Sequence, residues 1–185
     1  MTAKRSAGIL LFRGAETAGA EATGAGATGA EAADPAAVGR AGTGPVSAPQ
    51  VLLAHMGGPF WARKDERAWS IPKGEYEPDE APEAAARREF QEELGLPPPP
   101  GDLLALGSVQ QTGGKVVTVW ALAGDLDPRQ ITPGTFEMEW PRGSGRLQAF
   151  PEIDRVAWLD LAQARTKIVA RQEVFLDRLE ERLRG

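Results

Sequence analysis

The sequence predicts one domain of the α/β class. Two apolar runs, at residues 7–12 and 50–55, have the length and composition of strands, and residues 79–94 have the pattern of an amphipathic helix. Because strands and helices follow one another without regular alternation, an α/β or α+β domain is favoured over an all-β one. At about 150 residues per domain, the length of 185 residues fits a single domain.

Residues 14–49 separate the two apolar runs and differ from them in composition. Of these 36 residues, 8 are Gly and 13 are Ala. Such a segment lacks the large apolar side chains whose burial offsets the entropy cost of ordering the chain. We therefore predict a flexible Gly/Ala-rich insertion at 14–49, within a single domain over residues 1–185, that joins two neighbouring strands.

The predicted helix at 79–94 has defined ends. Asp79 is the expected N-cap, Pro82 suits the first turn, and Gly95 suits the C-terminal cap. The prolines at 97–100 cannot continue a helix. One face of the helix carries an apolar stripe, which consists of Ala86, Phe90 and Leu94.

Further strands are predicted after this helix. The segments 103–111 and 115–123 alternate as strands and are joined by Thr112-Gly113-Gly114, which indicates a hairpin. Residues 124–151 are interrupted by proline and glycine, and we expect them to be irregular. A short strand is predicted at 155–159.

The tail from Asp160 to Arg184 is predicted to be helical. Within it Phe175, Leu179 and Leu183 recur every four residues, which places them on one face against the core.

Composition excludes several classes of function. The absence of cysteine excludes disulfides, thiol nucleophiles and thiolate metal sites. The one histidine, His55, cannot form a multi-histidine zinc site within one chain, and its place at a strand end indicates a structural role. A net charge of -5 argues against general nucleic-acid binding, and no apolar run approaches the roughly 18 residues of a membrane span. We expect a cytoplasmic protein without a nucleic-acid or membrane partner.

The predicted helix gathers negative charge on one side. Glu89, Glu92 and Glu93 stand at positions i, i+3 and i+4, so their carboxylates project in the same direction. A solvated acidic face is the structural interpretation of such a cluster. The functional interpretation is a site for a hard cation, Mg²⁺ or alternatively Mn²⁺, which prefers oxygen ligands.

The spacing around these glutamates decides between the two interpretations. From Gly74, five residues lead to Glu80, and seven more lead to the segment 88–96, Arg-Glu-Phe-Gln-Glu-Glu-Leu-Gly-Leu. This resembles the signature of the Nudix hydrolases, G-x5-E-x7-R-E-U-x-E-E-x-G-U with U bulky and apolar, at each specified position. The resemblance implies an α/β/α sandwich with a mixed sheet, and Mg²⁺-dependent hydrolysis of a nucleoside diphosphate linked to another group.

The resemblance also implies roles for single residues. Glu92 and Glu93 correspond to the metal-binding pair, and Glu89 to a glutamate that binds metal or acts as general base. The family commonly supplies a backbone carbonyl from the residue before the signature glycine, which here is Lys73. Four further residues correspond to structural positions of the signature; they are Gly74, Glu80, Arg88 and Gly95.

Basic and aromatic residues lie just before the signature. Arg63, Lys64 and Lys73 are candidates to bind substrate phosphates. For Arg67, ordinary surface charge is an equally good interpretation. The lead-in from Trp69 to Gly74 resembles the W-x-x-P-K-G of Nudix enzymes that act on dinucleoside polyphosphates and diphosphoinositol phosphates. We therefore count Trp69 and Lys73 among the substrate-binding candidates.

A later loop often adds a glutamate to the metal site in this family. Glu139 is our choice, with Glu137 and Glu152 as the alternatives. Trp61, Trp69, Phe136 and Trp140 are the aromatics that would stack on a base, although aromatic residues more often belong to the core.

The predicted function is hydrolysis of a pyrophosphate bond in a nucleoside or dinucleoside polyphosphate, a small-molecule partner. The alternatives left open are substrates of the ADP-ribose or diphosphoinositol type, and a Nudix domain that senses a nucleotide without cleaving it. Residues 14–49 would recruit a partner in a third alternative. Many Nudix enzymes are dimers, so the resemblance also allows a homodimer.

Overall fold

The computed structural model describes residues 4–14, 48–111 and 113–185, so most of the predicted insertion, residues 15–47, lies outside the described residues. Seven strands of the described chain form one sheet; they are β1 (Arg5–Arg13), β2 (Gln50–Met56), β3 (Trp69–Ser70), β4 (Lys73–Glu75), β5 (Leu103–Gln110), β6 (Val116–Ala123) and β9 (Ile153–Asp160). Their order is β3-β2-β1-β6-β5, with β4 also on β1 and β9 also on β2.

Strand β1 lies at the centre of this sheet. It runs parallel to β6 and antiparallel to β4, whose Lys73 is the partner of Gly8. At its end, Phe12 and Arg13 pair antiparallel with Val51 and Gln50 of β2. The two apolar runs are therefore neighbours, as predicted, and the sheet is mixed. The predicted hairpin is present as the antiparallel pair β5 and β6.

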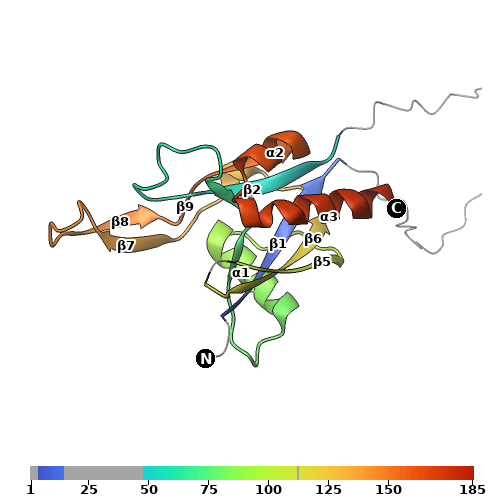
Figure 1. Ribbon diagram of the computed structural model, residues 1–185, viewed down its shortest axis with the longest axis horizontal. Helices are drawn as coiled ribbons and strands as arrows, with labels where there is room; N and C mark the ends of the chain where they lie inside the picture. The colour runs from blue at the N-terminus through green and yellow to red at the C-terminus, as the bar shows by residue number, and fades with distance from the viewer. Residues whose placement is uncertain (1–3, 15–47, 112) are drawn as a thin grey trace, which may run out of the picture.

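Helices cover both faces of the sheet (Figure 1), namely α1 (Pro82–Leu94) on one face, and α2 (Leu161–Lys167) and α3 (Glu173–Arg184) on the other. Alternate side chains of β1 explain this, because Ile9 and Leu11 pack in the core under α1 while Leu10 and Phe12 pack under α2 and α3. A strand buried on both faces reads as a continuous apolar run. The α/β/α sandwich with a mixed sheet is confirmed.

Helix α1 begins later than the sequence predicts. Its N-cap is Ala81, with no side-chain hydrogen bond, and Pro82 occupies the first turn. Asp79 lies in the preceding turn, so its assignment as N-cap is wrong. Proline fixes the backbone for the first helical turn and restricts the residue before it to an extended conformation, which ends the loop at Ala81. The predicted C-cap is correct, since Gly95 has φ +72 and donates to the Gln91 carbonyl.

The tail is two helices rather than one. Helix α2 ends at Lys167, a 3-10 turn covers Ala170–Gln172, and α3 follows. The break comes from tertiary contacts, because the Val169 amide donates to the Trp69 carbonyl of β3 (2.8 Å). The predicted face of α3 is correct: Phe175 and Leu179 are buried, and Leu183 packs against them.

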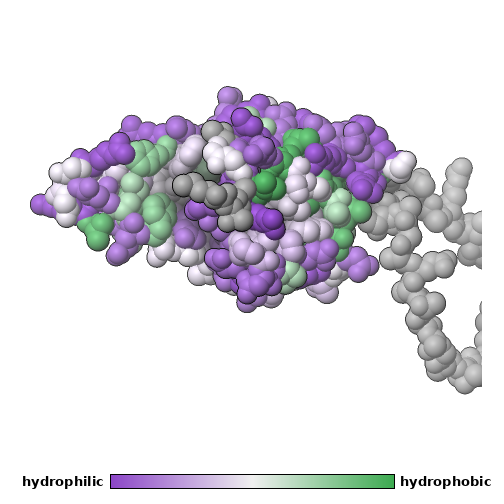
Figure 2. Space-filling view, turned by 60° about the horizontal axis from the view of Figure 1, so that its bottom comes forward, coloured by the Kyte–Doolittle hydropathy of each residue, from purple (hydrophilic) through white to green (hydrophobic). Residues whose placement is uncertain are grey.

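Residues 124–151 are more regular than predicted. They contain a separate hairpin, β7 (Thr135–Glu139) with β8 (Leu147–Pro151), which projects from one end of the molecule (Figure 1). A space-filling view shows apolar surface on this projection (Figure 2). Trp140 anchors it by edge-to-face contacts with Phe60 (5.5 Å) and Phe150 (6.4 Å). The alternation of Phe136 and Met138 with polar residues is the strand signal that the abundance of proline and glycine obscured.

Within the described ranges, no helix has the length and apolar character needed to cross a membrane.

Candidate active site

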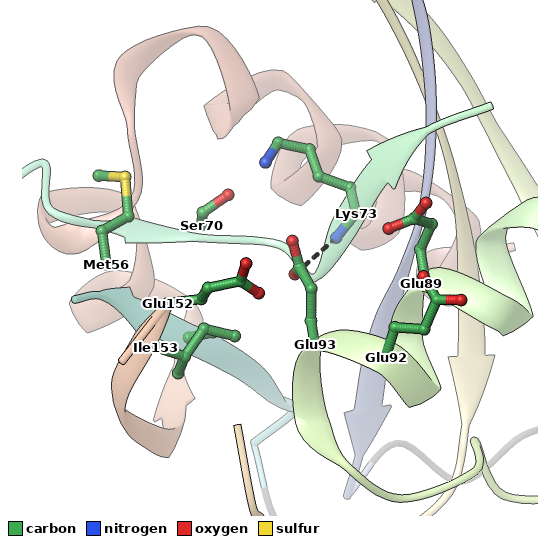
Figure 3. A pocket seen from close by; sticks show the side chains of 9 residues that line it. Met56, Ser70, Lys73, Glu89, Glu92, Glu93, Glu152 and Ile153 are labelled. Atoms are coloured by element: carbon green, nitrogen blue, oxygen red, sulfur yellow. Dashed lines mark hydrogen bonds between the residues drawn. The ribbon is translucent and has the colours of Figure 1, made fainter. Parts of the chain in front are cut away.

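A cavity of about 320 Å³ opens where α1, β4 and the start of β9 meet (Figure 3). Four carboxylates and one ammonium group are among its lining side chains; they belong to Glu89, Glu92, Glu93, Glu152 and Lys73. The three glutamates of α1 that the sequence singles out therefore lie together beside β4. Their spacing on the helix turns all of them toward the same strand.

Glu89 packs directly on the backbone of β4. A Cβ atom built on Gly74 would lie 1.7 Å from Glu89 Oε2, so any larger residue here would displace the Glu89 carboxylate from its present position. The Glu89 side chain is only 12% exposed. Gly74 thus has a physical role, which is to leave room for this carboxylate.

Arg88 links the glutamates of the cavity to the loop that precedes α1. Its guanidinium donates to Glu89 Oε1 (2.6 Å) and Glu92 Oε2 (2.9 Å), and also to both oxygens of Glu80 (2.9 and 2.8 Å). The contacts with Glu80 and Glu89 raise the pKa of Arg88, and the Arg88 guanidinium lowers the pKa of Glu80. A planar guanidinium suits this arrangement because it offers several donors in fixed directions. Arg88 therefore orients carboxylates, and Glu80 holds Arg88.

Glu93 is the most perturbed acid of the cavity. The pKa of Glu93 is raised to about 7, mainly by burial and to a smaller extent by the nearby Glu89 and Glu152, whereas Lys73 opposes the shift. The Lys73 backbone amide donates to Glu93 Oε2 (3.0 Å), as the dashed line in Figure 3 marks. Burial also lowers the pKa of the Lys73 ammonium. A cluster of perturbed groups in one cavity is typical of functional sites.

The structure brings Glu152 to the cavity and does not bring Glu139. Glu139 lies in β7, where its carboxylate accepts the Gly145 amide (2.6 Å) within the hairpin. Glu152, between β8 and β9, is fixed because its carbonyl accepts the Gly57 amide (2.8 Å). A Cβ atom on Gly57 would lie 1.9 Å from the Pro151 carbonyl oxygen, so this contact also requires glycine. The structure therefore places Glu152, and not Glu139, at the cavity.

Three predicted substrate-binding residues lie elsewhere. Trp69 is 4% exposed and belongs to the core. Successive side chains of a strand point to opposite faces, so the next residue, Ser70, lines the cavity instead. Arg63 and Lys64 lie in the exposed loop between β2 and β3, and neither lines the cavity. The Lys64 ammonium instead lies over the Trp61 ring, 4.7 Å from its centroid.

His55 is fully buried and ties this loop to β9. Its Nδ1 lies 2.5 Å from Asp154 Oδ1, and its Nε2 lies 2.7 Å from the Lys64 carbonyl oxygen. Each ring nitrogen of His55 therefore has an oxygen partner, one on β9 and one in the loop. His55 is not among the residues that line the cavity, in agreement with a structural role.

The donor set of the cavity fits a hard divalent cation. Four carboxylates, without imidazole or thiolate, are the ligands that Mg²⁺ and Mn²⁺ prefer. In the arrangement described for residues 4–14, 48–111 and 113–185, no three His, Cys, Asp or Glu side chains converge closely enough to hold an ion. Arg88 engages Glu89 and Glu92, and the Lys73 amide engages Glu93. In this structure the three carboxylates of α1 thus have hydrogen-bond donors of the protein as their partners.

Comparison with known proteins agrees with this geometry. The family model described as the NUDIX domain matches residues 40–179. The chain therefore belongs to the Nudix family, as the signature indicates.

Individual relatives are similar over a part of the chain or in fold alone. An RNA pyrophosphohydrolase of Hahella chejuensis is 41% identical over 56 residues, which is 30% of this chain and 35% of that protein. A C. elegans Ap4A hydrolase binary complex has a TM-score of 0.57 at 17% identity, covering 97% of this chain and 98% of that one. The NUDIX domain of Shewanella oneidensis NrtR complexed with ADP ribose has a TM-score of 0.57 at 15% identity, covering 99% and 90%.

Proposed function

We propose that this protein is a Mg²⁺-dependent pyrophosphohydrolase that cleaves a phosphoanhydride bond in a nucleoside or dinucleoside polyphosphate. The observation that carries the proposal is a cavity that four glutamates and one lysine line together. Anhydride hydrolysis needs the charge of the phosphate oxygens neutralised and a water molecule deprotonated. Membership of the Nudix family supports this class of reaction.

The residues divide the work as follows. Glu92, Glu93 and Glu152 would hold the cation, together with the Lys73 carbonyl that the signature assigns to this role. When bound, the cation neutralises phosphate charge and lowers the pKa of a bound water. Glu89 accepts the proton of the attacking water, and Arg88 and Gly74 fix its position. The Lys73 ammonium neutralises charge on the phosphates.

Substrate identity is tested by a screen with Mg²⁺. It includes nucleoside triphosphates, dinucleoside polyphosphates, ADP-ribose, diphosphoinositol phosphates and an RNA with a 5′-triphosphate. The last is added because a relative is named an RNA pyrophosphohydrolase, although this chain covers only 35% of its length. Product analysis identifies the bond that is cleaved.

The carboxylates are tested by Glu92→Gln and Glu93→Gln, which keep the shape and remove the charge. We expect each to lower kcat by about a hundredfold or more. Glu181→Gln on the exposed side of α3 is the matched control, and its rate should equal that of the wild type. Near wild-type rates for both cavity variants would contradict the proposal.

A nucleotide sensor without hydrolysis is the second candidate. It predicts binding of a nucleotide with no turnover in the presence of Mg²⁺ and Mn²⁺. All glutamates of the signature are present in this chain, which favours the enzyme.

A further inference from the structure

A second cavity, also of about 320 Å³, adjoins the first. The two share Met56, Ser70 and Lys73, so they form a continuous depression divided by the lysine. The second cavity extends away from α1 to the 3-10 turn that precedes α3, where Arg171 and Gln172 line it.

The two cavities differ in charge. The first has four glutamates, whereas the described residues that line the second include no acid and two cations, Lys73 and Arg171. A phosphate group without a bound cation is repelled by the first cavity and attracted by the second. The depression is therefore polarised, with oxygen ligands for a metal at one end and donors for an anion at the other.

The wall that carries Arg171 is firmly attached to the sheet. The neighbouring Gln172 is 1% exposed. Its Oε1 accepts the Ile71 amide (2.9 Å) and its Nε2 donates to Ser70 Oγ (3.1 Å). Both contacts join the 3-10 turn to the segment that leads into β4. The cavity is thus a fixed feature and does not depend on a free loop.

Both cations have donors available for a ligand. In Figure 3 the Lys73 side chain extends toward Ser70 and away from Glu89 and Glu92. The Arg171 guanidinium makes one long hydrogen bond to the Gln110 carbonyl (3.4 Å), and within the described ranges it has no carboxylate partner. A guanidinium has five N–H donors, so most of them remain for phosphate oxygens.

We propose that the second cavity binds the phosphoryl groups of a polyphosphate chain that are not attacked, with Lys73 at the boundary and Arg171 at the far end. The site then favours substrates with three or more consecutive phosphates over diphosphates. The inference rests on the proposed function, because it assumes that the first cavity holds the bond that breaks.

Binding without turnover locates the ligand. Inorganic tripolyphosphate is titrated calorimetrically into the metal-free full-length protein in excess chelator. We expect Arg171→Gln to raise Kd about tenfold, equal to about 1.4 kcal/mol, and Glu92→Gln to leave Kd unchanged or lower it. Arg182→Gln, an exposed arginine of α3, is the control for loss of one positive charge. Equal effects of Arg171→Gln and Arg182→Gln would overturn the proposal.

Kinetics then test chain length. Nucleoside di-, tri- and tetraphosphates are compared with Mg²⁺, and Arg171→Gln should lower kcat/KM for the tetraphosphate about tenfold more than for the diphosphate. The same factor for every chain length would overturn the inference. A wild type that hydrolyses none of them would refute the proposed function instead, and the tripolyphosphate titration would still decide whether the second cavity binds phosphate. Unfolding curves verify that each variant is folded.

Discussion

Glu93 is buried, and its burial predicts a pH-dependent stability. Its pKa is about 7 in the folded protein against 4.5 as the ordinary value, with burial as the main cause. Between these values an unfolded chain has already lost the proton that the folded protein retains. Stability is therefore fully present below about pH 4.5 and is lost as the pH rises through about 7.

The substitution Glu93→Gln removes the loss of stability at high pH, because the amide side chain does not ionise. In metal-free protein at pH 8, we expect the variant to be more stable than the wild type by about 1 to 3 kcal/mol, and at pH 4 the two should be equal. Mg²⁺ at pH 8 should reverse the order, because only the wild type has the full set of ligands. Urea unfolding with chelator and with Mg²⁺ measures both effects. A constant difference between the two proteins from pH 4 to pH 8 would contradict the assigned cause.

Single residues of the site were predictable where helical spacing or the signature fixed them. Glu89, Glu92 and Glu93 share one side of a helix by sequence separation alone, and the structure places all three in the cavity. Glu152 was the third choice because no local pattern fixes its position. It reaches the cavity through an amide contact with Gly57, nearly a hundred positions away. Trp69 lies in the core and its neighbour Ser70 lines the cavity. This was not predictable, because the sequence alone does not tell which side chain of a two-residue strand faces the core.

At the scale of elements, the contact between β4 and α1 sets the geometry of the site. Gly74→Ala places a methyl group against the Glu89 carboxylate. Since the obstructing atoms are the far end of a flexible side chain, the carboxylate can move aside. We expect a loss of stability below about 1 kcal/mol and a fall in kcat of about a hundredfold.

Gly143→Ala is a suitable control for this variant. Gly143 has φ +82 with no atom within 4 Å of an added Cβ, so the change introduces backbone strain without a clash. It should lower stability by about 1 kcal/mol and leave the hydrolysis rate unchanged. Gly74→Ala should therefore lower activity with little loss of stability, and Gly143→Ala should lower stability without loss of activity. A Gly74→Ala enzyme with a wild-type rate would show that Glu89 does not need its present position.

Elements with strong local signals were predicted well, and those shaped by tertiary contacts were not. Apolar runs and turn residues predict the strands β1, β2, β5 and β6. The break between α2 and α3 has no proline or glycine to mark it, and it arises where Val169 bonds to Trp69. The projecting hairpin was missed because proline and glycine in its turn outweighed a short alternation in β7 and β8.

At the scale of the whole molecule, the pairing between the end of β1 and the start of β2 determines how the protein tolerates shortening of the segment that joins them. Arg13 and Gln50 are paired across the sheet, and Arg13 Nε donates to Gln50 Oε1 (3.0 Å). Replacing residues 15–47 by Gly-Ser would leave a loop long enough to close a hairpin. A shorter loop costs less closure entropy, so we expect the free energy of unfolding to rise by about 1 to 2 kcal/mol.

Activity of the shortened protein should stay within about twofold, because Arg13 and Gln50 do not line the cavity. Hydrolysis, thermal unfolding and gel filtration of both proteins make the comparison. A shortened protein that loses activity or cooperative unfolding would contradict the expectation. If only association is lost, the segment serves a partner or a second copy, which is the alternative that its composition left open.

The central position of β1 has a consequence for how the chain folds. Arg5 at its start pairs with Val116 of β6, more than a hundred positions later. During synthesis β1 emerges first, yet one of its long edges stays unpaired until β6 has left the ribosome. Such distant pairing slows folding and leaves an apolar strand edge exposed to other chains in the meantime. The yield of soluble protein should therefore depend on expression rate and chaperone supply more than the native stability alone suggests.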